Sequence, residues 1–292
     1  MDWPIKQITT GEKVYPKFLA QIHNPPKKLY CRGNISLLNS NCFAVVGTRK
    51  LTSYGVETTQ QIVKDLANNG FTIVSGLALG IDAIAHQTTI DCGGKTIAVL
   101  GGGVGDKNIG PRTNFPLAKN ILKSDGLLIS EYSEQESIRA FNFALRDRII
   151  SGLSLGVLVI EADEKSGALI TAKCALDQNR DVFAVPGNIL SPRSTGPNSL
   201  IQNGAKLVMN AYDIINEYHE NLQLFPEKKK LSLVKNPTEK KIMDTLNEHG
   251  ILFIDDIIRM SGMETSTISV SLSMLEIRGI IKHIGNGKYR KI

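Results

Sequence analysis

Six short apolar runs recur at intervals of roughly 25–30 residues, and they constrain the fold more than any other feature of the chain. The runs are CFAVV at 42–46, FTIV at 71–74, TIAVL at 96–100, GLLIS at 126–130, GVLVIE at 156–161 and DVFAV at 181–185. Each is apolar at consecutive positions, which is typical of strands that are covered by helices on both faces. The pattern therefore predicts an α/β fold with an extended Rossmann-like, doubly wound and mostly parallel sheet.

The stretches between the runs have helical spacing. After the first run, Thr52 and Ser53 offer an N-terminal cap, and Val56, Val63 and Leu66 recur on one helical face. The sequence Asn68-Asn69-Gly70 then predicts the end of this helix.

The two ends of the chain have a different character. Residues 1–41 are rich in proline and lack periodicity, which favours an N-terminal arm or small subdomain laid on the sheet domain of 42–219. Residues 220–236 contain three consecutive lysines and are interpreted as a solvated linker. Within 237–292, three segments with helical spacing, 238–248, 253–261 and 265–278, precede two short strands joined by Asn286-Gly287. This order predicts a small C-terminal winged helix-turn-helix domain.

Positive charge is concentrated towards the C-terminus. The chain has 34 basic and 28 acidic side chains, of which residues 226–292 hold 12 and 8. The main body is nearly neutral, so a nucleic-acid footprint on it has to be local. The four cysteines lack CxxC spacing, and there is neither a secretory leader nor a run of about 18 apolar residues. We expect reduced thiols, a cytoplasmic location and no membrane contact.

Glycine and hydroxyl residues gather where the predicted strands end. The junctions are VVGTR at 45–49, VSGLALGID at 74–82, LGGGVG at 100–105 and EADEKSGALITA at 161–172. In a parallel sheet they share the carboxyl edge, where backbone N–H groups and the hydroxyls of Thr48, Ser75, Ser166 and Thr171 can bind phosphates. The alternative is that the glycines serve tight turns alone. No Walker A motif or full dinucleotide fingerprint is present, so we expect no cofactor.

Basic and aromatic side chains alternate in the segment RAFNFALRDRIISGLS. Arg139, Arg146 and Arg148 lie among Phe141 and Phe143, and a further arginine, Arg49, follows the first glycine junction. Guanidinium groups on phosphates and phenyl rings on bases are what a single-strand binder needs. The alternative is that both phenylalanines are core residues and that Arg148 pairs with Glu131 or Glu161.

Hydrolytic and metal sites have weak support. Ser75, His86 and either Asp82 or Asp91 have the composition of a triad, but no GxSxG elbow surrounds the serine. The five histidines show no metal-ligand spacing. We therefore expect no catalytic residues and no metal.

The motifs, taken together and in order from about Tyr15 to Asp213, resemble the DNA-processing protein A family (DprA, also called Smf). Those that carry the resemblance include VVGTRKLTSYG, IVSGLALGIDAIAH, RDRIISGLS, VIEADEKSGALITAKCAL and STGPNSLIQNGA. The resemblance implies a non-enzymatic protein that binds single-stranded DNA, forms a homodimer and loads the RecA recombinase during natural transformation. It also implies an optional winged helix at the C-terminus and a dimer surface near residues 190–215.

The resemblance also implies a set of DNA-binding residues. They are Gly47, Thr48, Arg49, Ser75, Gly76, Gly80, Arg139, Phe143, Arg146, Arg148, Ser166, Gly167 and Lys173, with Asp82 in the second glycine loop. Arg49 is the expected main phosphate ligand. Three departures stand out: the family's usual RNR has Asp147 in the middle, Ile109-Gly110-Pro111 replaces a Tyr-Pro, and the 41 residues before the first strand leave no room for an N-terminal helical module. Asp147 adds an acid near the expected strand path, so we expect weaker affinity.

Two other classes of function stay open. A phosphoribohydrolase of the LOG type has a related sheet, but its PGGxGTxxE motif has no counterpart in EADEKSGALITA. A winged-helix transcription regulator would read one duplex sequence. Release of base from nucleoside monophosphates would favour the first, and a sequence-specific duplex footprint the second.

Overall fold

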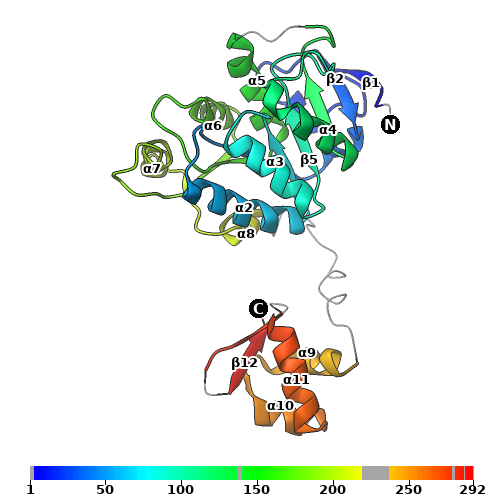
Figure 1. Ribbon diagram of the computed structural model, residues 1–292, viewed down its shortest axis with the longest axis vertical. Coiled ribbons are helices and arrows are strands. Elements are labelled where there is room, and N and C mark those ends of the chain that lie inside the picture. Colours follow the sequence, from blue (N-terminus) through cyan, green and yellow to red (C-terminus); the bar gives the residue numbers. More distant parts are fainter. Residues whose placement is uncertain (1–2, 137–139, 219–236, 278–279, 286, 292) are drawn as a thin grey trace. The chain divides into compact units, whose positions relative to one another are not determined.

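The computed structural model describes residues 3–136, 140–218, 237–277, 280–285 and 287–291. The chain divides into two compact units, Met1–Leu224 and Phe225–Ile292. Figure 1 shows the first as a sheet between helices and the second as a small helical unit with its own strands.

The first unit is built on one large sheet with the strand order β1-β2-β6-β5-β4-β3-β7-β8-β9. Its parallel strands are β3 (Cys42–Val46), β4 (Thr72–Ser75), β5 (Thr96–Val99), β6 (Leu127–Ser130), β7 (Gly156–Val159), β8 (Asp181–Ala184) and β9 (Lys206–Leu207). All six predicted strands are present, and the doubly wound, mostly parallel sheet is confirmed. The strand order reverses at β3, which pairs with β4 on one side and β7 on the other. The carboxyl end of this pair is the switch point, where such sheets bind ligands.

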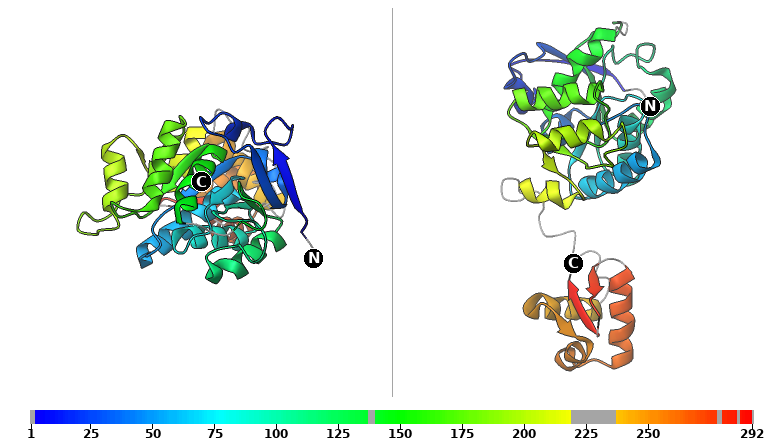
Figure 2. Two further views of the ribbon diagram at one scale, coloured as in Figure 1. Left: turned by 90° about the horizontal axis from the view of Figure 1, so that it is seen from above. Right: turned by 90° about the vertical axis from the view of Figure 1, so that its left-hand side faces the viewer.

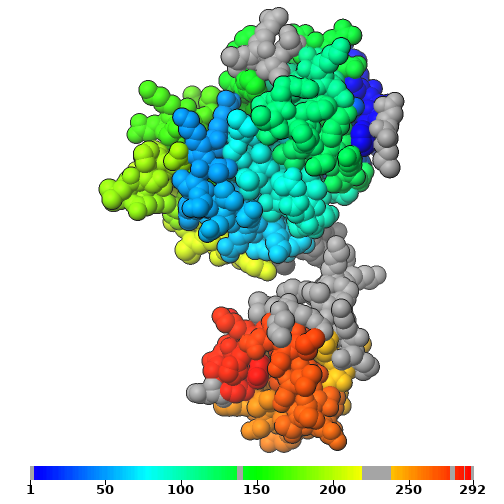
Figure 3. All heavy atoms as spheres, in the orientation of Figure 1, coloured from blue at the N-terminus to red at the C-terminus, as the bar shows by residue number. Residues whose placement is uncertain are grey.

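Helices cover both faces of this sheet (Figures 1 and 2). One face carries α1 (Lys17–Ala20), α5 (Ala140–Leu153) and α6 (Gly167–Asp177), whose apolar residues share a core with alternate positions of the strands. The other carries α2 (Ser53–Asn68), α3 (Ile81–Asp91), α4 (Phe115–Lys123) and α8 (Tyr212–Tyr218). In Figure 3, α2 and α3 lie side by side and cover this face in blue and cyan. The remaining helices are the 3-10 turns η1 (Ile35–Asn39) and η2 (Arg112–Asn114) and the α-helix α7 (Thr195–Gln202).

The segment before β3 enters the sheet. The sequence predicts an arm or subdomain laid on the domain, but β2 (Lys28–Gly33) pairs antiparallel with β6, and β1 (Ile5–Thr9) pairs antiparallel with β2. Leu29 and Cys31 of β2 are fully buried. Both strands are difficult to predict from the sequence because they are short and lie beside proline-rich segments. Each also buries few residues, Ile8 in β1 and Leu29 and Cys31 in β2.

Local signals set the helix ends as the sequence predicts. The Thr52 hydroxyl accepts a hydrogen bond from the N–H of Gly55 at 3.1 Å and caps α2, which ends before Asn69 and Gly70. The backbone of Gly70 has φ +80°, which a glycine adopts without strain.

The second unit contains α9 (Pro237–His249), β10 (Leu252–Phe253), α10 (Ile254–Ser261), α11 (Thr265–Ile277), β11 (Ile281–His283) and β12 (Lys288–Lys291). Its strands form a sheet in the order β10-β12-β11. Ile268, Leu272 and Leu275 of α11 are fully buried in its core. The linker expected at 220–236 lies entirely outside the described residues. The assignment of the second unit as a winged helix stays a prediction. In the part of the chain that the structure describes, no helix is both long and apolar enough to cross a bilayer.

Candidate nucleic-acid interface

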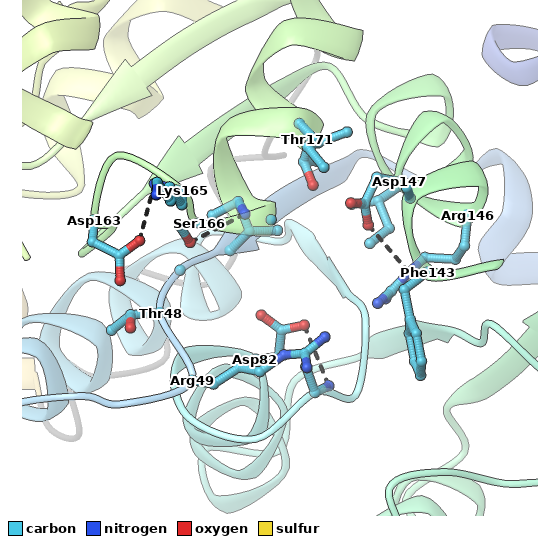
Figure 4. A pocket seen from close by; sticks show the side chains of 18 of the residues that line it. Thr48, Arg49, Asp82, Phe143, Arg146, Asp147, Asp163, Lys165, Ser166 and Thr171 are labelled. Carbon is cyan, nitrogen blue, oxygen red and sulfur yellow. Dashed lines mark hydrogen bonds and ion pairs between the residues drawn. The ribbon is translucent and has the colours of Figure 1, made fainter. Parts of the chain in front are cut away.

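A pocket of about 490 Å³ opens at the switch point. Its walls are the turn after β3, the turn after β7, the first half of α6 and the middle of α5 (Figure 4). Segments more than one hundred residues apart in the sequence therefore meet here, because β3 and β7 are neighbours in the sheet.

The turn after β3 carries Gly47, Thr48 and Arg49. The N–H of Thr48 donates to the carbonyl of Glu161 at 2.6 Å, which ties this turn to the one after β7. A Cβ on Gly47 would lie 2.6 Å from the side chain of Ile81, so the close packing of α3 requires glycine. Held in this way, the buried Thr48 and the exposed Arg49 line the pocket.

Asp82, in the first turn of α3, holds the loop after β4 in place beside the pocket. One carboxylate oxygen of this buried residue accepts hydrogen bonds from the N–H groups of Gly76 at 3.0 Å and Ala78 at 3.3 Å. Gly76 itself lies against the guanidinium of Arg146, and a Cβ there would be 1.5 Å from its Nη1. The glycine loop thus makes room for an arginine from α5, and the backbone N–H groups of Gly76 and Ala78 are already used by Asp82.

Helix α5 contributes Phe143, Arg146 and Asp147 to the opposite wall. Arg146 is only 5% exposed, donates to the carbonyl of Val99 at 3.0 Å and pairs with Asp147 at 3.2 Å between Nε and Oδ1. The half-buried ring of Phe143 lies 5.5 Å from the guanidinium carbon of Arg49 and 5.9 Å from that of Arg146. An aromatic ring and two cations are thereby brought close together.

The N-terminus of α6 forms the rim. Ser166 is the N-cap and accepts from the N–H of Ala168 at 3.3 Å. Just before it, Asp163 accepts from the N–H of Lys165 at 3.1 Å, so that both exposed side chains flank the entrance. Nothing lies within 4 Å of the Cβ position of Gly167, which leaves the first turn of α6 open to a ligand.

Two buried carboxyl groups and one imidazole show shifted pKa values. Burial raises the pKa of Asp82, and the nearby Arg146 and the hydrogen bonds that Asp82 accepts oppose the rise. Burial raises the pKa of Asp147 to about 7; Asp82 adds to this, while Arg146, Arg49 and Thr171 oppose it. His86 is fully buried, and burial together with Arg146 lowers its pKa to about 3, so its ring is neutral.

The pocket brings together seven of the predicted site residues. They are Gly47, Thr48, Arg49, Phe143, Arg146, Ser166 and Gly167, and Asp82 joins them. Gly76 and Gly80 support the pocket from the neighbouring loop without lining it.

Three other predicted residues lie elsewhere. The hydroxyl of Ser75 is fully buried and donates to the carbonyl of Val45 at 2.7 Å. Arg148 forms a two-point ion pair with Glu131 at 2.7 and 2.8 Å, which is the alternative that the sequence left open. Lys173 is exposed on α6 but does not line the pocket. Arg139 lies outside the described residues.

Sequence analysis did not single out Lys50, Asp163 and Lys165, although all three line the pocket. The available signal was their place in the chain: Lys50 directly follows the junction at 45–49, and Asp163 and Lys165 lie within the junction at 161–172. Every such turn in a parallel sheet faces the same edge.

The alternative hydrolytic triad does not assemble. Ser75 bonds to the backbone of Val45, the Nδ1 of His86 lies 2.7 Å from the hydroxyl of Thr96, and Asp82 bonds to backbone N–H groups. Among the described residues, no group of three or more potential ligands could hold a metal ion. Glu161, a further acid at this edge, is occupied with the N–H and hydroxyl of Thr52.

The fold and the pocket together define a Rossmann-like α/β protein with an open, charged and aromatic-flanked pocket at its switch point. Residues 6–219 match the family model described as "DNA recombination-mediator protein A", and the chain belongs to this family. The resemblance seen in the motifs is thereby confirmed.

Individual relatives agree with this assignment. The chain is 43% identical over 217 residues to the DNA processing protein DprA of Bacillus subtilis, covering 74% of this chain and 72% of the relative. The crystal structure of DprA from Streptococcus pneumoniae is similar with a TM-score of 0.69 and 41% identity, over 74% of each chain. A structure of DNA processing protein A from Helicobacter pylori, whose description concerns its single-stranded DNA binding mode, has a TM-score of 0.67 and 30% identity, over 76% of this chain and 98% of that one.

Proposed function

We propose that the protein is a recombination mediator that binds and protects single-stranded DNA and loads RecA onto it during natural transformation, without catalysing a reaction. The observation that carries the proposal is the pocket at the switch point, where Arg49 and Arg146 flank the ring of Phe143. Cations beside an aromatic face suit a strand whose phosphates and bases are both accessible. The relative from Helicobacter pylori, described as binding single-stranded DNA, supports this choice of ligand.

The pocket shape also favours a polymer over a small substrate. It is open to solvent along the loop of Asp163 to Gly167, and its polar groups are spread over three turns. A phosphoribohydrolase needs an acid that is free to act on the sugar, whereas Glu161 is held by Thr52 and Asp82 by two backbone N–H groups. Neither Glu161 nor Asp82 is therefore free to act as that acid.

The decisive experiment is a titration of fluorescent oligothymidylate at several salt concentrations with the wild type and Arg49→Ala. Removing one phosphate ligand should weaken binding to every sequence and reduce the log–log salt slope by ~0.7. Lys64→Ala is the matched control, since it removes an equal charge from an exposed position on α2 outside the pocket. Arg49→Ala binding with wild-type affinity and slope would remove the proposed interface.

A homodimer is part of the same proposal. Large apolar side chains are exposed in the segment that follows β8: Ile189, Leu190, Leu207, Met209 and Tyr212. Leu207 lies in β9, the edge strand of the sheet, and Met209 and Tyr212 follow it in the chain. Apolar side chains at a sheet edge suit a self-complementary contact. Two strand sites held together would gain avidity on one DNA molecule.

Sedimentation velocity tests the dimer. We expect a species of about twice the 31.9 kDa chain mass at micromolar concentration and a monomer for Met209→Glu. A wild type that sediments only as a monomer would exclude the dimer, and failure to stimulate RecA assembly on protein-coated DNA would exclude the loading function.

A further inference from the structure

Asp147 occupies an unfavourable position for a protein that binds an anion. It lies on α5 in the wall of the pocket, is 7% exposed and pairs with Arg146, whose guanidinium would serve a phosphate (Figure 4). An ionised carboxylate here repels the ligand and competes for the same cation.

Every element packed around Asp147 contributes to its surroundings. The groups that face it are Arg146 on α5, Asp82 on α3, Arg49 in the turn after β3, and Thr171 and Cys174 on α6. Asp163 and Lys165 lie at the rim of the same pocket, together with Lys50. With all carboxyls ionised, the pocket lining has four basic and three acidic side chains, so the loss of one acid doubles its net positive charge.

We propose that the pocket takes up one proton from solvent when it binds a DNA phosphate, and that the carboxyl group of Asp147 receives it. The inference rests on the proposed function, because the anion is a phosphodiester of the bound strand. Protonation removes the repulsion and releases Arg146 from its ion pair. When the strand dissociates, the proton returns to solvent.

Asp147 accepts the proton in preference to Asp82 for a geometric reason. The carboxylate of Asp82 accepts two backbone hydrogen bonds, which stabilise its charged form. Asp147 has one ion pair, to Arg146, which is also bonded to the carbonyl of Val99, and one hydrogen bond from the side chain of Thr171. The pKa of Asp147 near 7 places the uptake in the neutral range.

The sign of the pH dependence follows from linkage. A phosphate near Asp147 raises the pKa of its carboxyl further, so the complex binds more protons than the free protein above pH 7. Affinity should be constant well below pH 7 and fall by up to about tenfold per pH unit above it.

The test is fluorescence anisotropy with a hydroxyl-terminated oligothymidylate between pH 6 and 8.5 at constant ionic strength. Such a strand has phosphodiesters alone, whose charge is constant over this range. We expect the affinity of the wild type to fall above pH 7 and that of Asp147→Asn to be flat and higher at pH 8.5. Asp163→Asn is the matched control, because it removes an exposed acid from the rim of the same pocket. This variant should retain the pH dependence of the wild type.

Calorimetry on the wild type gives a second, independent readout. At pH 7.5 to 8, titrations in buffers of different ionisation enthalpy should reveal the uptake of a substantial fraction of one proton per bound strand. This measurement decides the question even if Asp147→Asn does not fold. No proton uptake, or an Asp147→Asn variant with the wild-type slope, would overturn the inference. Wild type that binds no single-stranded DNA at pH 6 would instead overturn the proposed function.

Discussion

At the scale of single residues, Asp147 links the pocket to folding stability. Its pKa is about 7 in the folded protein and about 4 in an unfolded chain. Because the folded state binds the proton more tightly, this group makes stability decrease as pH rises from about 4 to about 7, with no further change above. Asp147→Asn should therefore raise the free energy of unfolding more at pH 8 than at pH 5, by at most ~3 kcal/mol, because about two of the three units of the pKa shift lie above pH 5. Urea unfolding at both pH values measures this, and an equal gain at both would contradict it.

Phe143 is the second residue whose contribution to strand binding can be measured separately from that of the charged side chains. The centre of its ring is 5.5 Å from the guanidinium carbon of Arg49 and 5.9 Å from that of Arg146, and a Cβ on Gly101 would be 3.1 Å from the ring. Phe143→Ala should cost ~1–3 kcal/mol of strand affinity with an unchanged salt slope, because stacking releases no counterion. Phe141→Ala, an exposed ring outside the pocket lining, is the control and should cost less. If Phe143→Ala reduces the salt slope as well as the strand affinity, Phe143 acts by positioning Arg49.

At the scale of elements, the loop that enters α3 fixes the geometry of the Arg49 turn. Gly80 has φ +84°, and a Cβ there would lie 2.2 Å from the carbonyl oxygen of Thr48 and 2.7 Å from the Cα of Arg49. Gly80→Ala should lower the free energy of unfolding by more than ~1 kcal/mol and weaken strand binding, because backbone must move. Gly167→Ala is the control: its Cβ meets nothing within 4 Å, so stability should change by less than ~0.5 kcal/mol. Thermal unfolding of both variants distinguishes strain from a general effect of replacing glycine.

At the scale of the whole molecule, we expect the two units to have different binding functions, single-stranded DNA for the first and duplex DNA or a partner for the second. The exposed face of α11 presents Ser266, Val270, Ser273 and Met274, with Glu276 as its charged member among the described side chains. A helix that reads the major groove normally brings arginine, lysine, asparagine or glutamine to base edges. We therefore expect a chain that ends at Leu224 to retain most single-strand affinity, with any loss in duplex or partner binding. A folded truncation without strand binding, or an isolated second unit that binds one duplex sequence tightly, would reverse these roles.

Much of this architecture follows from the sequence by itself. Consecutive apolar residues identify β3 to β8, and capping residues locate both ends of α2, because these signals act between neighbours in the chain. The glycine turns after the strands could be assigned to one edge, since parallel strands all end on the same side. Two of these turns indeed meet in one pocket, where Arg49 and Ser166 both line the wall.

The partners and the burial of the side chains at that edge become visible in the folded chain alone. In the folded chain, β1 and β2 belong to the sheet and Arg148 pairs with Glu131. Arg146 is buried against Gly76 and Asp147. None of these outcomes has a local signal, because each depends on which distant segment supplies the partner and how much water remains between them. Burial in particular turns Asp147 from an ordinary acid into one that titrates near neutrality, and burial is a property of the packed molecule.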